Sequence, residues 1–234
     1  MKNLFIIITF LLAASSCGEK GQNPSKLDDL SFDEIQEIAK MHNTLLDKGM
    51  PKINGRVSSL ELKQSFLSIE IADISRQEKE KILNDVEKFD LKFLEDNIDS
   101  KSFQYILRAN TILNENNTLD EITEALGLLY TEVESSNINN KTAVLLYCAT
   151  ATKSAEYWLP VDKGGNGLGY GRLKSQRRNG RVLSTGKEIM AADALSLSAA
   201  FTGAGLLGWA GGPAGFFATV AFAGAFGSAA EALQ

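Results

Sequence analysis

Residues 194–230, ALSLSAAFTGAGLLGWAGGPAGFFATVAFAGAFGSAA, form the stretch of sequence that decides the fold. The stretch contains no charged residue and consists almost entirely of Ala, Gly, Leu, Phe, Ser and Thr. Gly211-Gly212-Pro213 divides it into two arms, residues 194–210 and 214–230, of seventeen residues each. At about 1.5 Å per residue, each arm makes a helix of about 26 Å, slightly shorter than a hydrocarbon core of about 30 Å. The pattern therefore predicts an apolar helical hairpin at the carboxyl end, over residues 188–234.

Small residues recur four positions apart along this hairpin. Such spacing lets two helix backbones approach closely, which offsets the cost of Gly in a helix, about 0.5–1 kcal/mol relative to Ala. The positions expected at the packing surface are Ala199, Gly203, Gly208, Gly211, Gly212, Gly215, Ala223 and Gly227. The pattern resembles glycine zippers, and the uncharged hairpin is similar to the hydrophobic hairpin of colicin-type pore formers and of small glycine-zipper bacteriocins. This resemblance implies membrane association or self-assembly, whereas the alternative is a hairpin buried as the core of a soluble bundle.

The amino-terminal segment is typical of an exported protein. Lys2 is followed by an uncharged apolar run over residues 4–14, which reads as a secretory signal and is too short for a spanning helix. Ala14-Ser15-Ser16 directly before Cys17 resembles the lipobox of bacterial lipoproteins, although the commonest lipobox has Leu three residues before the Cys and Gly or Ala just before it. The resemblance implies that residues 1–16 are removed. An ordinary signal peptide cleaved near Ser16 is the alternative.

The lipobox resemblance also implies a location and a modification. Cys17 is expected to carry diacylglycerol and an acyl chain such as palmitate, and each buried methylene contributes about 0.8 kcal/mol to membrane anchoring. Residues 17–30 have no periodic apolar pattern and are expected to form a tether. The expected location is the bacterial cell envelope, at the outer membrane, with membrane lipid as a partner. Cys148 is then left without an intramolecular partner, which excludes a disulfide framework.

Residues 31–160 predict an acidic all-α domain of about six helices. Ser31 with Glu34 has the spacing of a capping box, and the same spacing recurs at residues 58 and 61, 75 and 78, and 118 and 121. Apolar residues then recur at helical spacing, and the third of these helices is predicted to run from about residue 75 to residue 97. Residues 1–160 hold 17 basic and 25 acidic residues, a balance that disfavours nucleic acid as a partner.

The segment 161–187 reverses this charge. It has one acidic residue, Asp162, against seven basic residues, Lys163, Arg172, Lys174, Arg177, Arg178, Arg181 and Lys187. These side chains are expected to face anionic lipid head groups, and the alternative is that they pair with the protein's own acidic helices. The glycines of residues 163–171 predict a flexible loop with positive φ angles. A phosphate-binding P-loop is not predicted, because its spacing and residue types are missing.

Catalytic and metal-binding signatures are missing from the sequence. His42 is the single histidine, so no multi-histidine metal site or second imidazole is available. His42 is expected to lie on the apolar stripe of its helix and to hydrogen-bond a neighbour, with proton transfer or recognition as the alternative. Paired carboxylates such as Asp33 and Glu34 are explained by helix capping. We therefore expect no enzyme activity, no metal and no cofactor beyond the lipid on Cys17.

The wider layout is similar to that of uncharacterised helical lipoproteins of bacteria. It combines the lipobox, the stretch His42-Asn43 before Leu45-Leu46-Asp47, the stretch Ser154-Ala155-Glu156-Tyr157-Trp158 and the Gly/Ala-rich end. The sequence thus predicts a non-enzymatic, lipid-anchored envelope protein whose hairpin mediates membrane association or self-assembly. This prediction includes a toxin-like or pore-like activity and a homo-oligomer. The alternative is an envelope interaction or structural lipoprotein in which the hairpin is core.

Overall fold

The structure is a computed structural model, and it describes residues 30–50, 57–72, 74–86, 88–171, 186–207 and 213–233. Throughout these ranges the regular elements are helical, which confirms the all-α prediction. They are α1 Phe32–Gly49, α2 Ser59–Leu67, α3 Arg76–Val86, α4 Leu91–Asn97, α5 Ser100–Glu115, α6 Leu119–Ser135, α7 Lys141–Trp158, the 3₁₀ turn η2 Val161–Lys163, α9 Gly186–Leu207 and α10 Pro213–Leu233.

Local capping explains where several helices begin. At α1 the backbone N–H of Ser31 donates to Glu34 Oε2 over 2.8 Å, and the Glu34 N–H donates to Ser31 Oγ over 3.3 Å. The same reciprocal bonds open α2, α3 and α6. At α2 the hydrogen bonds from Ser58 lower the pKa of Glu61, because they stabilise the carboxylate. The four predicted capping boxes are therefore confirmed.

The predicted single helix over residues 75–97 is wrong, because the chain forms two helices there. α3 ends at Val86, and α4 begins at Leu91 after the N-cap Asp90, whose side chain accepts the backbone N–H of Phe93 over 2.7 Å. Between the two helices, the ring of Phe89 packs against Gly203 of α9. The break places an aromatic side chain on the hairpin that a continuous helix would direct elsewhere.

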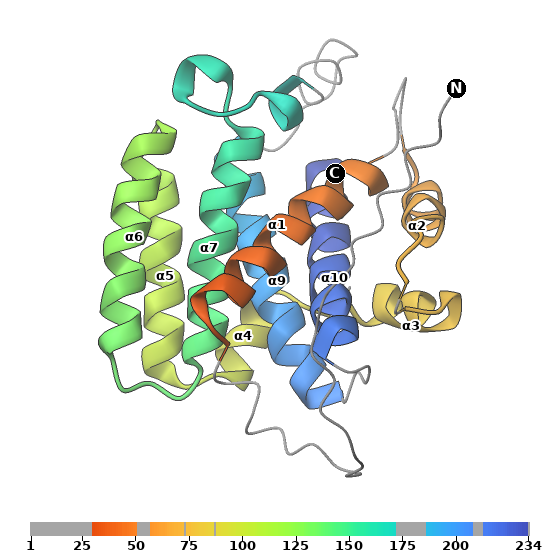
Figure 1. The fold of residues 1–234 in the computed structure, drawn as a ribbon, viewed down its shortest axis with the longest axis horizontal. Coiled ribbons are helices and arrows are strands. Elements are labelled where there is room, and N and C mark those ends of the chain that lie inside the picture. Colours follow the sequence, from red (N-terminus) through yellow and green to blue (C-terminus); the bar gives the residue numbers. More distant parts are fainter. Residues whose placement is uncertain are drawn as a thin grey trace.

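The hairpin of α9 and α10 lies at the centre of the molecule (Figure 1). α7 packs along α9, and α1 crosses in front of the layer formed by α7, α9 and α10. α5 and α6 cover the outer side of α7, whereas α2 and α3 lie beside α10. The apolar carboxyl-terminal helices are thus enclosed by the amphipathic helices that precede them in the chain.

Contacts between α9 and α10 show that the two helices are antiparallel. Phe201 stacks edge-to-face on Phe216 with ring centroids 5.8 Å apart, while Leu197 approaches Gly224 and Ser196 approaches Gly227. Position numbers fall along α9 as they rise along α10, as in a hairpin. Pro213 occupies the first position of α10, where its missing N–H costs no helical hydrogen bond. The predicted hairpin is therefore confirmed as a helical pair.

α10 is the helix, among the described residues, that is long and apolar enough to cross a membrane. The qualifying window is Gly215–Ala232, and 72% of that window is buried inside the protein. Burial of this kind is also the property of a core helix in a soluble bundle.

Candidate functional site

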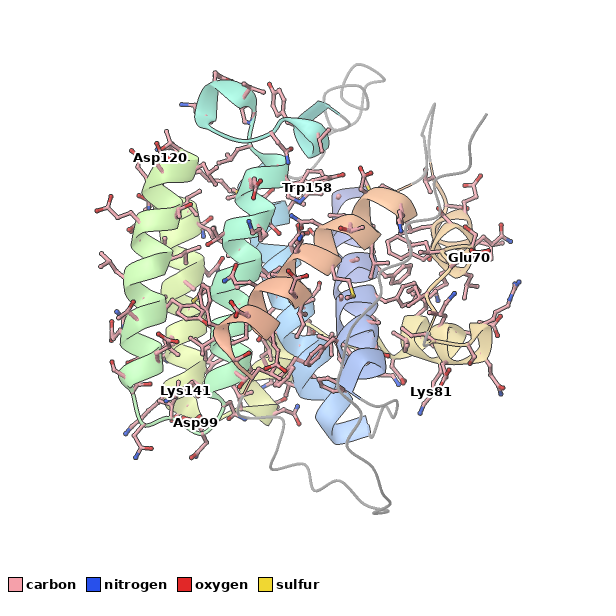
Figure 2. All side chains as sticks on the ribbon, in the orientation of Figure 1. Glu70, Lys81, Asp99, Asp120, Lys141 and Trp158 are labelled. Atoms are coloured by element: carbon pink, nitrogen blue, oxygen red, sulfur yellow. The ribbon has the colours of Figure 1, made fainter. Side chains whose placement is uncertain are left out.

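The most unusual feature of the interior is a carboxyl group in the apolar hairpin. Asp193 of α9 has no exposed surface. Its Oδ2 accepts a hydrogen bond from Ser154 Oγ over 2.7 Å and one from Trp158 Nε1 over 2.6 Å. Both donors come from α7, and Figure 2 shows Trp158 at the end of that helix opposite Lys141. The other oxygen, Oδ1, is buried and has no protein hydrogen-bond partner.

The environment of Asp193 changes its acidity. Burial raises the pKa of the carboxyl group, because the charged form loses its hydration. The charge of His42 and hydrogen bonds from Ser154, Trp158 and Ser228 act in the opposite direction and stabilise the carboxylate. Burial therefore favours the neutral acid at Asp193, whereas its polar partners favour the carboxylate.

His42 connects α1 to the same region. Its side chain is fully buried, and Nε2 lies 2.9 Å from Ser228 Oγ of α10. Nδ1 lies 3.0 Å from Asn43 Oδ1, and Asn43 Nδ2 in turn donates to the backbone carbonyl of Lys153 on α7 over 2.7 Å. We call His42, Asn43, Ser154, Trp158, Asp193 and Ser228 the buried polar network. It joins α1, α7, α9 and α10.

The order Ser228, His42, Asn43 matches the sequence of nucleophile, base and orienting group in a hydrolase. Burial argues against that use, since Ser228 and His42 have no exposed surface and a substrate would have no path to Ser228 Oγ. The Ser228 hydroxyl also donates to the backbone carbonyl of Gly224 over 2.8 Å, as is common for serines inside helices. We assign the network a structural role.

The small residues predicted to pack within the hairpin contact different neighbours. Ala199, Gly203, Gly215 and Ala223 are buried, and Gly227 is partly buried. A Cβ at Gly227 would lie 2.6 Å from Ser196 Oγ of α9, so this glycine serves the close approach of the two arms. A Cβ at Gly203 would instead collide with the ring of Phe89. Gly208, Gly211 and Gly212 lie outside the described residues.

Gly224 was not among the predicted packing positions. A Cβ there would lie 2.7 Å from Leu197 Cδ1 and 3.0 Å from Leu197 Cα, closer than side chains tolerate. The missing side chain of Gly224 thus allows α10 to approach the backbone of α9 closely at Leu197. Its spacing from Gly227 is three residues, and a search for Gly or Ala pairs four apart passes over it.

Two of the seven predicted basic side chains fall within the described residues. Lys163 is exposed, whereas the Lys187 ammonium donates to the backbone carbonyl of Asn114, at the end of α5, over 2.6 Å. A cation at the carboxyl end of a helix is stabilised by the helix dipole. Lys187 thus binds the protein's own helix. Arg172, Lys174, Arg177, Arg178 and Arg181, like Cys17 and residues 18–29 of the tether, lie outside the described residues.

The glycine-rich segment 163–171 is held in place by hydrogen bonds and close packing. Gly164 and Gly167 have φ angles of 88° and 73°, as the sequence predicts. The Asn166 N–H donates to the backbone carbonyl of Glu156 over 2.7 Å, and Gly169 packs directly on the rings of Tyr157 and Trp158. The predicted loop of residues 163–171 therefore packs against the end of α7.

A surface groove of about 490 Å³ lies between α5 and the turn at residues 136–138. Arg108, on its wall, forms a two-pronged ion pair with Glu132 of α6 at 2.8 and 2.7 Å, and Tyr105 donates to the same carboxylate over 3.1 Å. The hydrogen bond from Arg108 lowers the pKa of Glu132 to about 2. The Arg108 cation of this groove is thus already neutralised within the protein.

The residues that the structure describes hold no cluster of three or more His, Cys, Asp or Glu side chains that could bind a metal ion. Cys148 is buried, and burial raises the pKa of its thiol to about 12. Comparisons with protein-family models, with curated proteins and with solved structures gave no match.

Proposed function

We propose that the protein is a lipid-anchored protein of the bacterial cell envelope, held through Cys17 at the outer membrane, in which the apolar hairpin is the core of a helical interaction domain. The lipid on Cys17 supplies the membrane attachment, and residues 17–30 link it to the domain. The domain acts by binding or scaffolding and performs no catalysis.

The burial of the hairpin carries this proposal. α10 packs on α9, α1, α3 and α2, and α9 packs on α10, α7, α4 and α5. Hydrogen bonds from His42, Ser154 and Trp158 reach side chains of the hairpin that have no exposed surface. Insertion of the hairpin into lipid would break these bonds and expose the faces of the six helices that pack on it. A role as core therefore requires no rearrangement, whereas membrane insertion does.

The acidic surface supports an interaction role over nucleic-acid binding. The whole chain has a formal net charge of −5 and an isoelectric point of about 5.1. Such a surface repels phosphate backbones and favours basic or neutral partners. The partner class that follows is another envelope protein.

Cys17→Ala tests the anchor and the hairpin together. We expect the variant to lose palmitate labelling and to move from the membrane pellet to the soluble fraction, because the buried hairpin gives no second attachment. The matched control is Cys148→Ala, which removes the other cysteine and should leave labelling and membrane location unchanged. A Cys17→Ala protein that stays in the pellet after alkaline carbonate extraction would contradict the core role of the hairpin and support its insertion.

Membrane association or self-assembly through the hairpin is the second candidate. The length and low polarity of the Gly215–Ala232 window favour it. It predicts that the Cys17→Ala protein binds liposomes containing anionic lipid and releases a trapped dye. Neither binding nor leakage is expected if the hairpin serves as core.

A further inference from the structure

One cation at the surface groove between α5 and the turn at residues 136–138 has no partner among the described residues. The part of the groove wall that comes from α5 consists of Ser100, Lys101, Gln104, Tyr105 and Arg108. Arg108 is paired with Glu132, whereas the exposed ammonium group of Lys101 forms no ion pair or hydrogen bond with any residue that the structure describes. The residues that line the groove include no acid. The groove therefore keeps one positive charge that the protein does not neutralise.

The two carboxylates that neighbour the groove are directed to other donors. Asp99 Oδ1 accepts the backbone N–H groups of Lys101 and Ser102 over 3.1 and 3.2 Å, as the N-cap of α5. Glu132 accepts both prongs of the Arg108 guanidinium and the hydroxyl of Tyr105. Neither carboxylate forms an ion pair with Lys101. The ammonium group is thus available to an acceptor from another molecule.

Hydrogen bonds hold the two walls of the groove together. At the start of α5 the backbone N–H of Asp99 donates to Asn140 Oδ1 over 2.9 Å, which ties this helix to the chain that follows the turn. Figure 2 shows Asp99 at this end of the bundle. Further along α5, the bonds from Tyr105 and Arg108 to Glu132 join the helix to α6. The groove is therefore formed before any ligand binds, as is usual for binding sites.

Two carboxamide side chains that line the groove have no hydrogen-bond partner among the described residues. Gln104 belongs to α5 and Asn137 to the turn, so they come from opposite walls. A carboxamide has an acceptor oxygen and two donor hydrogens, which complement the N–H and C=O of a peptide group. The backbone N–H groups of Asn137 and Ile138 likewise have no acceptor within the described ranges. The walls can thus form hydrogen bonds with the main chain of an extended peptide.

The length of the groove fits a short piece of chain. Lys101, Gln104 and Arg108 are separated by three and four residues, so they lie on one face of α5 and span about 10 Å. An extended chain covers about 3.3–3.6 Å per residue, so about three residues fill this length. Tyr105 and Ile138, which are both partly buried, provide apolar surface for a side chain of such a segment.

The charge of the whole molecule restricts the kind of peptide. The chain has a formal net charge of −5, which disfavours strongly acidic partners. Lys101 nevertheless favours one negative charge in the groove. The carboxyl terminus of a protein supplies a single negative charge beside a main chain that needs no acidic side chain. Capture of a terminal carboxylate is a recurring mode of peptide recognition.

We propose that the groove between α5 and residues 136–138 binds about three carboxyl-terminal residues of a partner protein, with the terminal carboxylate at Lys101 and the main chain between Gln104 and Asn137. The inference rests on the binding role proposed above, and it specifies the surface and the part of the partner that this surface holds. Because Lys101 and Gln104 are exposed, the ion pair contributes modestly to affinity and is weakened by salt.

A peptide library tests the proposal without knowledge of the partner. The probe is a mixture of N-acetylated hexapeptides with three randomised carboxyl-terminal residues, and the control is the same mixture with amidated carboxyl termini. The Cys17→Ala protein is incubated with each mixture, and the peptides that it retains are identified by mass spectrometry. We expect peptides to be retained from the free-acid mixture and few or none from the amidated mixture.

Charge variants then locate the binding site. For the tightest peptide, we expect Lys101→Gln to raise the Kd by about threefold to tenfold, as for an exposed charged hydrogen bond. In this variant the free-acid and amidated forms should bind equally, since the charge that distinguishes them is gone. Lys81→Gln is the matched control, because Lys81 is also an exposed lysine without a partner among the described residues. It lies on α3, well away from Asp99 in Figure 2, and its replacement should leave the Kd unchanged.

Three results would overturn the proposal: equal retention of the two mixtures, no retention from the free-acid mixture, and an unchanged Kd in Lys101→Gln. Cellotriose, a neutral oligosaccharide, is measured in parallel, and its binding in place of the peptides would assign the groove to a glycan. None of these results bears on the anchor at Cys17, because the protein used carries no lipid. Palmitate labelling and membrane fractionation test the anchor separately, so the groove and the membrane attachment can fail independently.

Discussion

Trp158 donates its indole N–H to Asp193 Oδ2 over 2.6 Å, and this bond joins the end of α7 to the hairpin inside the core. Hydrogen bonds to charged groups contribute about 1.5–3 kcal/mol, and a buried acceptor that loses its donor is costly. We expect Trp158→Phe to lower the free energy of unfolding by about 2–4 kcal/mol, with the lost packing included. Urea unfolding followed by circular dichroism measures the change.

The neighbouring residue offers a matched control for that variant. Tyr157 is buried and donates over 3.3 Å to Asp47, which is exposed. Because water can replace such a bond, Tyr157→Phe should cost less than about 1 kcal/mol. If both variants lower the free energy of unfolding by the same amount, the bond to Asp193 contributes no more stability than the bond to Asp47.

Two helical glycines are predicted to respond oppositely to the same substitution. Gly224→Ala places a Cβ 2.7 Å from Leu197 Cδ1 and 3.0 Å from Leu197 Cα, so the arms of the hairpin must separate. Overpacking of this kind costs about 1–3 kcal/mol. Gly127 of α6 has nothing within 4 Å of the added carbon, and Gly127→Ala should stabilise the protein by about 0.5–1 kcal/mol. Thermal unfolding of both variants measures the difference, and a stabilised Gly224→Ala would show that the helices are not in close contact.

The Glu132 carboxylate is expected to give the fold a small sensitivity to acid. Its pKa of about 2 lies below the value of 4.5 for a free side chain, because Arg108 hydrogen-bonds the charged form. A lowered pKa contributes stability above the unfolded value, and that stability is lost as the pH falls from about 4.5 toward 2. Glu132→Gln should therefore narrow the difference in unfolding midpoint between pH 5 and pH 3. The effect should shrink in high salt, since the pair is exposed.

Local signals in the sequence predict much of this fold. Ser31 with Glu34 and Thr118 with Glu121 mark helix starts because each pair of hydrogen bonds forms within one turn. The helical hairpin is also evident, because its uncharged composition fits a pair of apolar helices, although the same composition suits lipid and a protein core equally. The break at Phe89 could not be predicted in the same way, since its ring fills a space that exists only once α9 is in place.

The polar network was only half visible in the sequence. His42 was expected to lie on an apolar stripe and to hydrogen-bond a neighbour, and it does so with Asn43. The role of Asp193 was missed, because its partners Ser154 and Trp158 precede it by 39 and 35 residues and meet it when α7 packs on α9. The sequence does contain a signal for this contact. Asp193 is a lone acid at the border of an apolar helix, and Ser154 and Trp158 lie one turn apart on another apolar helix.

The thiol of Cys148 is expected to be inert while the protein is folded. The side chain is 1% exposed, and burial raises its pKa to about 12, so almost no thiolate is present at pH 8. In the Cys17→Ala background, iodoacetamide at pH 8 should leave Cys148 unmodified over hours and alkylate it fully in 8 M urea, as measured by intact-protein mass spectrometry. Because Cys148 lies on α7 in the layer beside the hairpin, its alkylation rate also reports opening of that layer. Trp158→Phe should raise this rate by the factor by which it lowers the folding equilibrium constant, and Tyr157→Phe should raise it much less. Rapid alkylation of the folded Cys17→Ala protein would contradict a closed core around the hairpin.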